Sequence, residues 1–546
     1  MRRYLFPVML LLLALTSCKK EEQTSEVAQT PPNILYIMCD DHTTQAISAY
    51  EHPLSEVVET PNIDRLANEG IQFDRAFCTN ALCGPSRAVL LTGKYSHKNG
   101  FRHNADKFDA SQPTFINALD SAGYETAVIG KWHLKSTPQG FDHWEILPDQ
   151  GKYYNPDFIT KDGTHREEGY STDIITDKTI AWMDKQRDKN KPFCLLMHHK
   201  APHRNWMAAM RHLNKYDSVK FPVPENYLDR WDGRKALQEQ EMTVWKDMYE
   251  GHDLKLTKTA DTDELRFNPW TDDFDRLTPE QKAKWNEVYR KKNQSFFDEN
   301  IEQDPTKFAL WKYQRYMEEY LATCESVDES VGRVLDYLDK AGLAENTIVV
   351  FTSDQGFFLG EHGLFDKRFM YEETLRIPLL IRYPNGIKAG THSDAMVMNL
   401  DFAPTFLDYA GLNIPEEMQG KSMKPVMSRD SAPKDWRDAV YYHYYEYPGF
   451  HSAKRQYGIR TDRYKLIHFY NDIDEWELYD LEKDPHEMNN VIDEVAYADV
   501  KKDMMAKLEQ QMKQYDEPPY EEFKDTKLPL INMPRDPKYK GFTLER

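Results

Sequence analysis

One short stretch of the sequence gives a cysteine an unusual chemical setting. Cys83 is the second residue of LCGPSRAVLLTG, which runs from Leu82 to Gly93. Pro85 suits the first turn of a helix and Gly93 suits its end, so the stretch predicts a short helix with Cys83 at its N-terminus. Arg87 follows one turn later on the same face. The cysteine is half of a disulfide, a small buried apolar side chain or a reactive group, and the stretch alone leaves all three open.

The mouth of this helix favours an anion. A helix N-terminus presents partial positive charge and free N–H groups, and Arg87 adds a full charge. Such a cradle suits a tetrahedral oxyanion, either sulfate or phosphate. A capped structural helix with a buried cysteine is the simpler interpretation of an isolated C-x-P, so other features must decide.

Two clusters of oxygen ligands follow apolar runs that read as strands. Asp40 and Asp41 follow NILYIMC. Asp354 is the last residue of NTIVVFTSD, and Gln355 follows it. If both strands belong to one parallel sheet, the four side chains converge at its carboxyl edge. Oxygen-only ligation favours calcium, with magnesium possible, over zinc. One such pair is usually a helix cap or a solvated turn, whereas two pairs favour a metal site.

The stretch CGPSRAVLLTG resembles the full signature of type I sulfatases, the formylglycine-dependent family of the alkaline-phosphatase-like superfamily. That signature is C-x-P-S-R followed by a T-G pair. Further motifs similar to those of the family appear in the expected order, and the resemblance covers roughly residues 33–490. They are the Asp40-Asp41 pair, GKWH with Lys131 and His133, APH with His203, SDQG with Asp354 and Gln355, and FDK with Lys367.

The resemblance implies a modified catalytic residue and a metal. A maturation enzyme would oxidise Cys83 to formylglycine, and one hydroxyl of the hydrated aldehyde would attack the ester sulfur. The metal ligands implied by the family are Cys83 itself, Asp40, Asp41, Asp354 and Gln355.

The same resemblance assigns roles to the surrounding cations. Arg87, Lys131 and Lys367 would neutralise the sulfuryl oxygens. His203 would protonate the leaving alcohol, and His133 would take the proton from the second hydroxyl so that sulfate leaves. An unactivated sugar alcohol leaves badly, so the chemistry needs such an acid.

Within the family, GKYYNPDF, APHRNW and FDKRFMYEETLRIPLLIRYP are most similar to N-acetylglucosamine-6-sulfatases. This implies action on the 6-O-sulfate of N-acetylglucosamine in heparan, keratan or mucin-type glycans. Asp366 and Arg368 are expected to hydrogen-bond sugar hydroxyls, unless they only pair with each other. His443 and His451, in the aromatic stretch YYHYYEYPGFHSAKRQYGIR, are further substrate-binding candidates.

Other functions stay open at this point. The nearest is a sulfatase of another specificity, for a uronate 2-sulfate or a galactose 6-sulfate. A phosphatase or phosphonate hydrolase of the same superfamily is disfavoured by the all-oxygen ligand set. A lipoprotein that captures glycans without catalysis is disfavoured because the set of site residues is complete. One departure is Asn205, which replaces the last proline of a common P-H-x-P motif and suggests a less rigid loop around His203.

These side chains need a scaffold that brings strand ends together. Near-continuous apolar runs, typical of buried parallel strands, alternate with helical patterns such as residues 60–70 and 320–342. We therefore expect an α/β fold with a mostly parallel central sheet sandwiched by helices. The expected strands cover residues 33–39, 124–130, 193–199, 346–354 and 377–384.

Changes of composition suggest the domain boundaries. Residues 33–425 form the expected sulfatase catalytic domain, in which 204–310 is a polar helical and loop insertion. Residues 426–520 form a smaller C-terminal subdomain with an antiparallel sheet, including two strands about a turn at Thr461 and Asp462. Residues 521–546 are a tail.

The N-terminus predicts export. Arg2 and Arg3 precede LFPVMLLLLAL, which is typical of a signal peptide covering residues 1–17. LTSC resembles the lipobox of bacterial lipoproteins, which implies acylation of Cys18 and a membrane-anchored tether over residues 18–32. The expected protein is an exported lipoprotein, periplasmic or on the cell surface, with plain signal cleavage as the alternative.

The net charge limits the classes of binding partner, and the cysteine content bears on whether the protein has disulfides. A formal net charge of -20 excludes attraction of nucleic acid through the overall field, so an anionic glycan needs a local cationic pocket. Of the six cysteines, Cys18 is assigned to the lipid, while Cys39 and Cys194 lie inside strand-like runs. This distribution argues against a disulfide framework.

Overall fold

The centre of the molecule is a ten-stranded mixed sheet. The structure is a computed structural model that describes residues 31–428 and 432–523. The strands of this sheet are β1 (Asn33–Cys39), β2 (Ile71–Phe73), β4 (Glu125–Lys131), β5 (His143–Leu147), β6 (Asp157–Thr160), β7 (Gly163–Arg166), β8 (Phe193–His198), β9 (Thr347–Ser353), β12 (Leu379–Arg382) and β13 (Thr391–Ser393). Their order is β13-β2-β12-β9-β1-β8-β4-β5-β6-β7.

The middle of the sheet is parallel and fully buried. Strands β9, β1, β8, β4 and β5 run parallel, and every residue of β1, β8 and β9 is buried, as expected for strands covered on both faces. The five strands expected from the apolar runs are all present. One differs in direction, because β12 pairs antiparallel with both β9 and β2.

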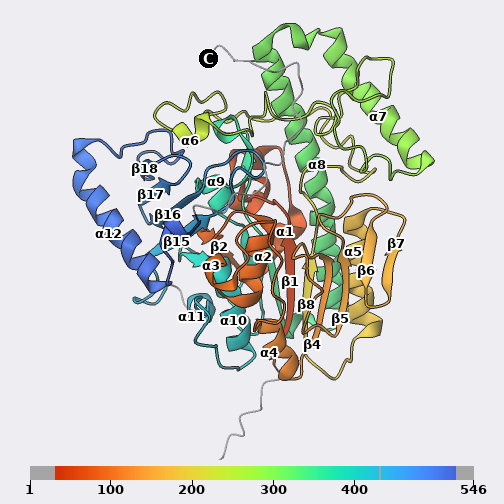
Figure 1. Ribbon diagram of the computed structural model, residues 1–546. Helices are drawn as coiled ribbons and strands as arrows, with labels where there is room; N and C mark the ends of the chain where they lie inside the picture. The colour runs from red at the N-terminus through yellow and green to blue at the C-terminus, as the bar shows by residue number, and fades with distance from the viewer. Residues whose placement is uncertain (1–30, 429–431, 524–546) are drawn as a thin grey trace, which may run out of the picture.

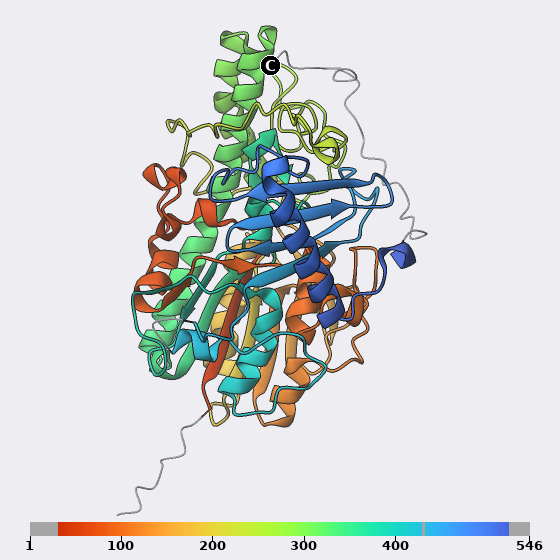
Figure 2. The same cartoon turned by 90° about the vertical axis from the view of Figure 1, so that its left-hand side faces the viewer.

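Helices cover the sheet on both sides (Figures 1 and 2). In one layer α8 (Pro305–Lys340) contacts α1 (Pro61–Glu69) and α5 (Ser171–Ala181). In the other, α10 (Phe402–Tyr409) contacts α2 (Cys83–Thr92) and α4 (Phe115–Ser121). The expected α/β sandwich is therefore confirmed. Helix α8 begins earlier than predicted because Asp304 caps it by accepting from the N–H groups of Thr306 and Lys307.

The segment between β8 and α8 extends beyond the carboxyl ends of the central strands, at the top of Figure 1. Residues 204–310, all of them described, carry α6 (Lys235–Gln238), α7 (Pro279–Asp298) and the start of α8, and otherwise mostly turns. A capping box between Thr278 and Gln281 starts α7. The polar composition that predicted helices and loops here thus corresponds to a segment without regular strands.

The C-terminal part of the chain forms a second sheet. It has the order β15 (Ala439–Tyr444), β16 (Gln456–Thr461), β17 (Tyr464–Phe469) and β18 (Glu475–Asp480), is antiparallel throughout, and contacts α12 (Ala498–Gln514). The predicted turn at Thr461 and Asp462 joins β16 to β17. Strand β15 was not predicted; its aromatic residues are all buried in the sheet.

Short elements complete the described chain. They include the hairpin β10 (Phe358–Leu359) and β11 (Phe365–Asp366), the pair β3 (Ala76–Phe77) and β14 (Val397–Met398), and the short helices α3 (Ser96–Asn99), α9 (Glu372–Leu375) and α11 (Lys424–Met427). No helix among the described residues is long and apolar enough to cross a membrane. The expected signal peptide, Cys18, nearly all of the tether and most of the tail lie outside the described residues.

Candidate active site

The unusual cysteine lies at the start of a buried helix, as its sequence predicts. Helix α2 begins at Cys83, and Gly93 ends it with a φ of 63°, a conformation that favours glycine. All ten residues of the helix are buried, and Cys83 is only 1% exposed. The five cysteines among the described residues are all free, so Cys83 is not part of a disulfide.

Oxygen ligands from two neighbouring strands converge on this cysteine. Strands β1 and β9 pair in register up to Cys39 and Ser353, so the residues that follow them are neighbours. The backbone N–H of Asp41 donates to Asp354 Oδ1 at 3.2 Å, and Cys83 Sγ lies 3.1 Å from Asp40 Oδ1. One ligand atom from each of these four side chains lies within 4.8 Å of the others: Asp40, Asp41, Cys83 and Asp354.

The electrostatics of this cluster favour a cation. Burial raises the pKa of Asp41 to about 7, with Lys367 opposing the shift and Asp40 and Asp354 adding to it through repulsion. Burial and repulsion by Asp40 likewise raise the pKa of Asp354 to about 6. Gln355 contributes a buried Oε1 that has no hydrogen-bond partner among the described residues. Three carboxylates and a free amide oxygen are a donor set that fits a hard divalent ion.

Each carboxylate also has its own protein cation. Lys367 Nζ donates to both carboxylate oxygens of Asp41 at 2.5 and 2.7 Å. Lys131 forms an ion pair with Asp40, and Arg87 Nη2 lies 2.9 Å from Asp354 Oδ2. These attractions hold the pKa of Asp40 well below its usual range although burial opposes ionisation.

The two predicted histidines come from different elements, and His203 borders the cluster whereas His133 is connected to it through Gln150 and Lys131. His203, which follows β8, has Nε2 3.8 Å from Asp41 Oδ2, and its Nδ1 donates to the carbonyl of Arg204 at 2.6 Å. His133 follows β4, and its Nε2 accepts from the Gln150 amide at 3.2 Å. Burial lowers the pKa of both imidazoles well below the usual value.

Buried contacts tether the loop that carries His203, and the lower rigidity expected from Asn205 stays a prediction. Arg204 forms a bidentate pair with Asp253 at 2.8 and 2.6 Å, and both side chains are largely buried. Lys255 Nζ donates to the carbonyl of Asn205 at 2.7 Å. Residues of the segment 204–310 therefore tether this loop, in which the last proline of the P-H-x-P motif is missing.

A cavity of about 350 Å³ opens onto this cluster, with Cys83, His203 and Lys367 among its lining residues. Asp366, Arg368 and His451 line it too. Arg368 Nε lies 3.0 Å from Asp366 Oδ1, and His451 Nε2 lies 3.4 Å from Asp366 Oδ2. Asp366 and Arg368 thus pair with each other and also line the cavity, and their contact with sugar hydroxyls stays a prediction.

His443 is a correction, because the structure places it away from the cavity. Its ring nitrogens lie 2.9 Å from Glu517 Oε1 and 2.7 Å from the Tyr470 hydroxyl, and its ring stacks on Tyr445 at 3.7 Å. The side chain belongs to β15, is buried within the antiparallel sheet region, and is not among the residues that line the cavity.

Several lining residues were missed by sequence reasoning. Gln150 accepts from Lys131 and donates to His133, so it joins two of the predicted site residues. Lys200 precedes the APH motif directly, and that adjacency is the one sequence signal that pointed to it. Lys152 and Phe450 lie within GKYYNPDF and YYHYYEYPGFHSAKRQYGIR, but neither was singled out there. Other lining residues come from loops without any motif, among them Asn104, Trp270, Asp272 and Asp273.

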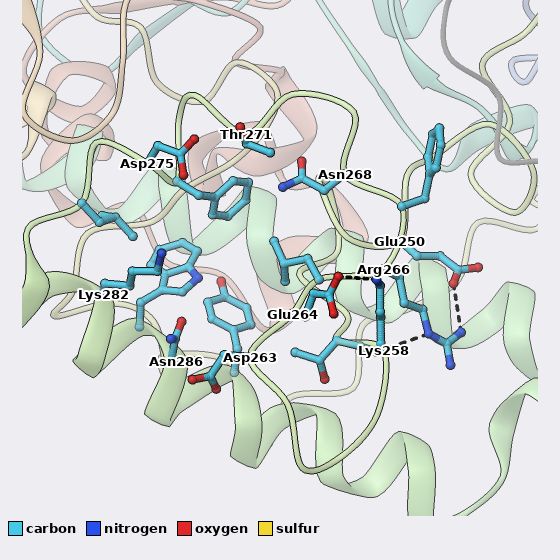
Figure 3. Close-up of a pocket in the computed structure, with 17 residues that line it drawn as sticks. Glu250, Lys258, Asp263, Glu264, Arg266, Asn268, Thr271, Asp275, Lys282 and Asn286 are labelled. Carbon is cyan, nitrogen blue, oxygen red and sulfur yellow. Dashed lines mark hydrogen bonds and ion pairs between the residues drawn. The ribbon is translucent and has the colours of Figure 1, made fainter.

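The structure has a larger cavity that is not the active site. It has a volume of about 720 Å³, lies wholly within residues 250–289, and contains none of the predicted site residues (Figure 3). Two of its three basic lining side chains are in ion pairs, Arg266 with Glu250 and Lys258 with Glu264, and the third is Lys282. The chemistry is therefore concentrated in the smaller cavity above Cys83.

A buried carboxylate cluster with a helix-mouth cysteine and two histidines defines a metal-assisted ester hydrolase. The family comparison makes this specific: a model described as Sulfatase matches residues 32–412, and one described as N-sulphoglucosamine sulphohydrolase, C-terminal, matches residues 360–514. The chain belongs to the sulfatase family and is a sulfuric ester hydrolase.

Named relatives agree with this assignment. The chain is 52% identical to an N-acetylglucosamine-6-O-sulfatase of Bacteroides thetaiotaomicron, over 94% of this chain and 90% of the relative. It is 26% identical to the N-acetylglucosamine-6-sulfatase of Homo sapiens, over 76% of this chain and 67% of the relative. A solved structure in complex with its substrate D-glucosamine-2-N,6-O-disulfate matches with a TM-score of 0.85 and 53% identity, over 89% of this chain and 98% of that one.

Proposed function

We propose that the protein hydrolyses the 6-O-sulfate ester of N-acetylglucosamine-type sugars from sulfated glycans. The observation that carries this is the cavity itself, in which Cys83, His203 and Lys367 face Asp366, Arg368 and His451. The 52% identity to an N-acetylglucosamine-6-O-sulfatase over nearly the whole chain supports the specificity.

Two groups complete the site in this proposal. The residue at position 83 together with four oxygen donors would hold calcium, which would supply Lewis-acid polarisation of the sulfate oxygens; the four donors are Asp40, Asp41, Asp354 and Gln355. Formylglycine, made from Cys83 by a maturation enzyme, supplies the nucleophilic hydroxyl. The sulfatase family generally uses both a formylglycine and a divalent metal, and the oxygen-rich donor set favours calcium in particular.

The protein's own residues then perform the binding and the proton transfers. Lys131 and Lys367 surround the cluster with positive charge, so they stabilise the charge that develops on the sulfuryl oxygens. His203 faces the cavity and donates its proton to the leaving sugar oxygen, since an anionic ester beside it favours the protonated ring. His133, oriented by Gln150, accepts the proton that must leave before sulfate departs.

One experiment tests both the modification and the specificity. Mass spectrometry of the Cys83 peptide from active protein should show conversion of the thiol to the aldehyde. A panel of sulfated monosaccharides should show release of sulfate from N-acetylglucosamine-6-sulfate. If that sugar is untouched while a uronate 2-sulfate or galactose 6-sulfate is desulfated, the proposed specificity is wrong.

We also propose that the protein is an exported lipoprotein, anchored to a membrane through Cys18. The support is the signal-like N-terminus and its LTSC motif. In the full chain, Cys18→Ser should release the protein from the membrane fraction. Protease treatment of intact cells distinguishes a surface location from a periplasmic one, and a wild-type protein found free of membranes contradicts the proposal.

A further inference from the structure

Lys200 is a cation in the active cavity that lies outside the predicted catalytic set. It follows β8, lines the cavity and is only 3% exposed. The other lysines and arginines that line the cavity are all in ion pairs: Lys152 with Asp272 and Asp273, Arg204 with Asp253, Lys367 with Asp41, and Arg368 with Asp366 and Glu446. Among the described residues, no carboxylate lies within ion-pair distance of Lys200.

A buried ammonium without a counter-ion is costly, so its position needs an explanation. Burial lowers the pKa of Lys200 to about 8, which leaves the side chain mostly charged at neutral pH. Its Nζ lies 4.8 Å from the centre of the Tyr153 ring, a cation–π contact that offsets only part of the cost. An anion in the cavity is the partner that would compensate for the rest.

The surroundings of Lys200 already hold anionic oxygens. Lys152 forms ion pairs with Asp272 and with Asp273 Oδ1, the latter at 3.2 Å. Asp273 also exerts the strongest charge interaction on Lys200. These two carboxylates lie on the loop that separates the active cavity from the larger one of Figure 3, so that loop presents negative charge to this part of the wall.

The scissile sulfate does not need Lys200. The carboxylate cluster at Cys83 has Arg87, Lys131 and Lys367 as its own cations. Along the sheet, Lys200 and Lys152 follow β8 and β5, whereas Asp366 and Arg368 come from the segment that follows β9, on the other side of β1. The two groups of side chains therefore reach the cavity from different parts of the fold.

We propose that Lys200 forms a subsite for a second anionic group on the substrate sugar, a sulfo group other than the 6-sulfate. This rests on the proposed function. The 2-N-sulfo group in the substrate of the similar solved structure belongs to this chemical class, and a 3-O-sulfo group is the other source of the same chemistry. The subsite explains why the cavity keeps a buried, unpaired ammonium.

The test measures kcat/KM of the metal-loaded, modified enzyme on three sugars: N-acetylglucosamine-6-sulfate, glucosamine-2-N,6-O-disulfate and glucosamine-3-O,6-O-disulfate. Lys200→Met keeps the length of the side chain but removes the charge. It should lower kcat/KM on one disulfated sugar at least tenfold more than on the monosulfated one, because a charge-assisted contact is lost. The sugar that shows this loss identifies the source of the sulfo group.

Two further variants guard against a purely structural effect. Lys200→Arg should keep most of the preference for the disulfated sugar. Asp273→Asn should increase that preference about threefold, because it removes a competing negative charge. Lys291→Met, a change of an exposed lysine on α7, is the matched control and should leave all ratios unchanged.

The possible outcomes distinguish a failure of the subsite from a failure of the proposed function. If Lys200→Met lowers kcat/KM equally on all three sugars, the subsite is wrong and Lys200 acts on the scissile group or on the fold. If Lys200→Met does not fold, Asp273→Asn decides, and an unchanged or reduced preference overturns the subsite. If wild-type enzyme desulfates none of the three sugars, the proposed function itself fails.

Discussion

The floor and the walls of the active cavity are built in different ways. The floor comes from residues that follow β1 and β9 directly, Asp41 and Asp354 among them, and from the first residue of α2. The walls come from loops, such as those carrying Arg368, Lys200 and His451. A register of parallel strands fixes the floor, whereas contacts between distant segments, such as the ion pair of Arg368 with Glu446, hold parts of the walls. The floor therefore carries the chemistry, and the walls can vary in which sugar they accept.

The largest effect is expected from the floor. Cys83→Ala removes the residue that we propose as the precursor of the nucleophile and should lower kcat by at least about 10⁴-fold, to the limit of detection. Binding of the sulfated sugar should persist, because the cations of the cavity remain. Turnover assays and calorimetric binding on the same preparation measure the two quantities. Activity above a few per cent of wild type contradicts a nucleophile derived from Cys83.

Removal of the metal should have the next largest effect. Chelation leaves three buried carboxylates at the strand ends without their cation, so activity should fall by about 10²-fold or more. Calcium should restore it, and magnesium should restore part of it, since both are hard ions that accept oxygen ligands. Restoration by zinc alone contradicts the ligand set inferred here, and no loss on chelation contradicts a metal site.

Substitution of Asp253, which pairs with the wall residue Arg204, should have a smaller effect on catalysis and a larger effect on stability than the two changes above. Asp253→Asn leaves the buried guanidinium of Arg204 unpaired, which should destabilise the fold by about 3 kcal/mol. The adjacent His203 loses its anchor, so kcat/KM should fall roughly tenfold or more. Thermal unfolding and steady-state kinetics measure these effects, and unchanged kcat/KM in folded protein means that the loop is held by other contacts.

The pH dependence of this variant has a defined sign. Burial opposes ionisation of Asp253, but the charge of Arg204 holds its pKa well below the usual range. A carboxyl with a lowered pKa in the folded state stabilises the protein above its unfolded pKa of about 3.9 and loses that contribution as pH falls further. The stability difference between wild type and Asp253→Asn should therefore be constant from pH 6 to 8 and shrink below about pH 4.

The sequence predicts the floor of the cavity better than its walls. Asp40, Asp354 and Cys83 follow local patterns, an apolar strand that ends in acidic residues and a helix start, so spacing and motif predict both the fold and the floor. Lys200 and His443 have no such pattern. Whether a loop or strand side chain faces the cavity depends on partners hundreds of residues away, and a single sequence does not reveal those pairings.

The smallest catalytic effect is expected at His443, the candidate that the structure removes from the cavity. His443→Phe keeps the ring but loses its hydrogen bonds to Glu517 and Tyr470, which leaves two buried polar groups with fewer partners. The free energy of unfolding should fall by about 1–3 kcal/mol. Because the side chain does not line the cavity, kcat/KM should stay within about twofold of wild type, and both quantities can be measured on one preparation. A tenfold loss of kcat/KM at unchanged stability would instead make His443 a substrate contact and extend the wall into the C-terminal sheet.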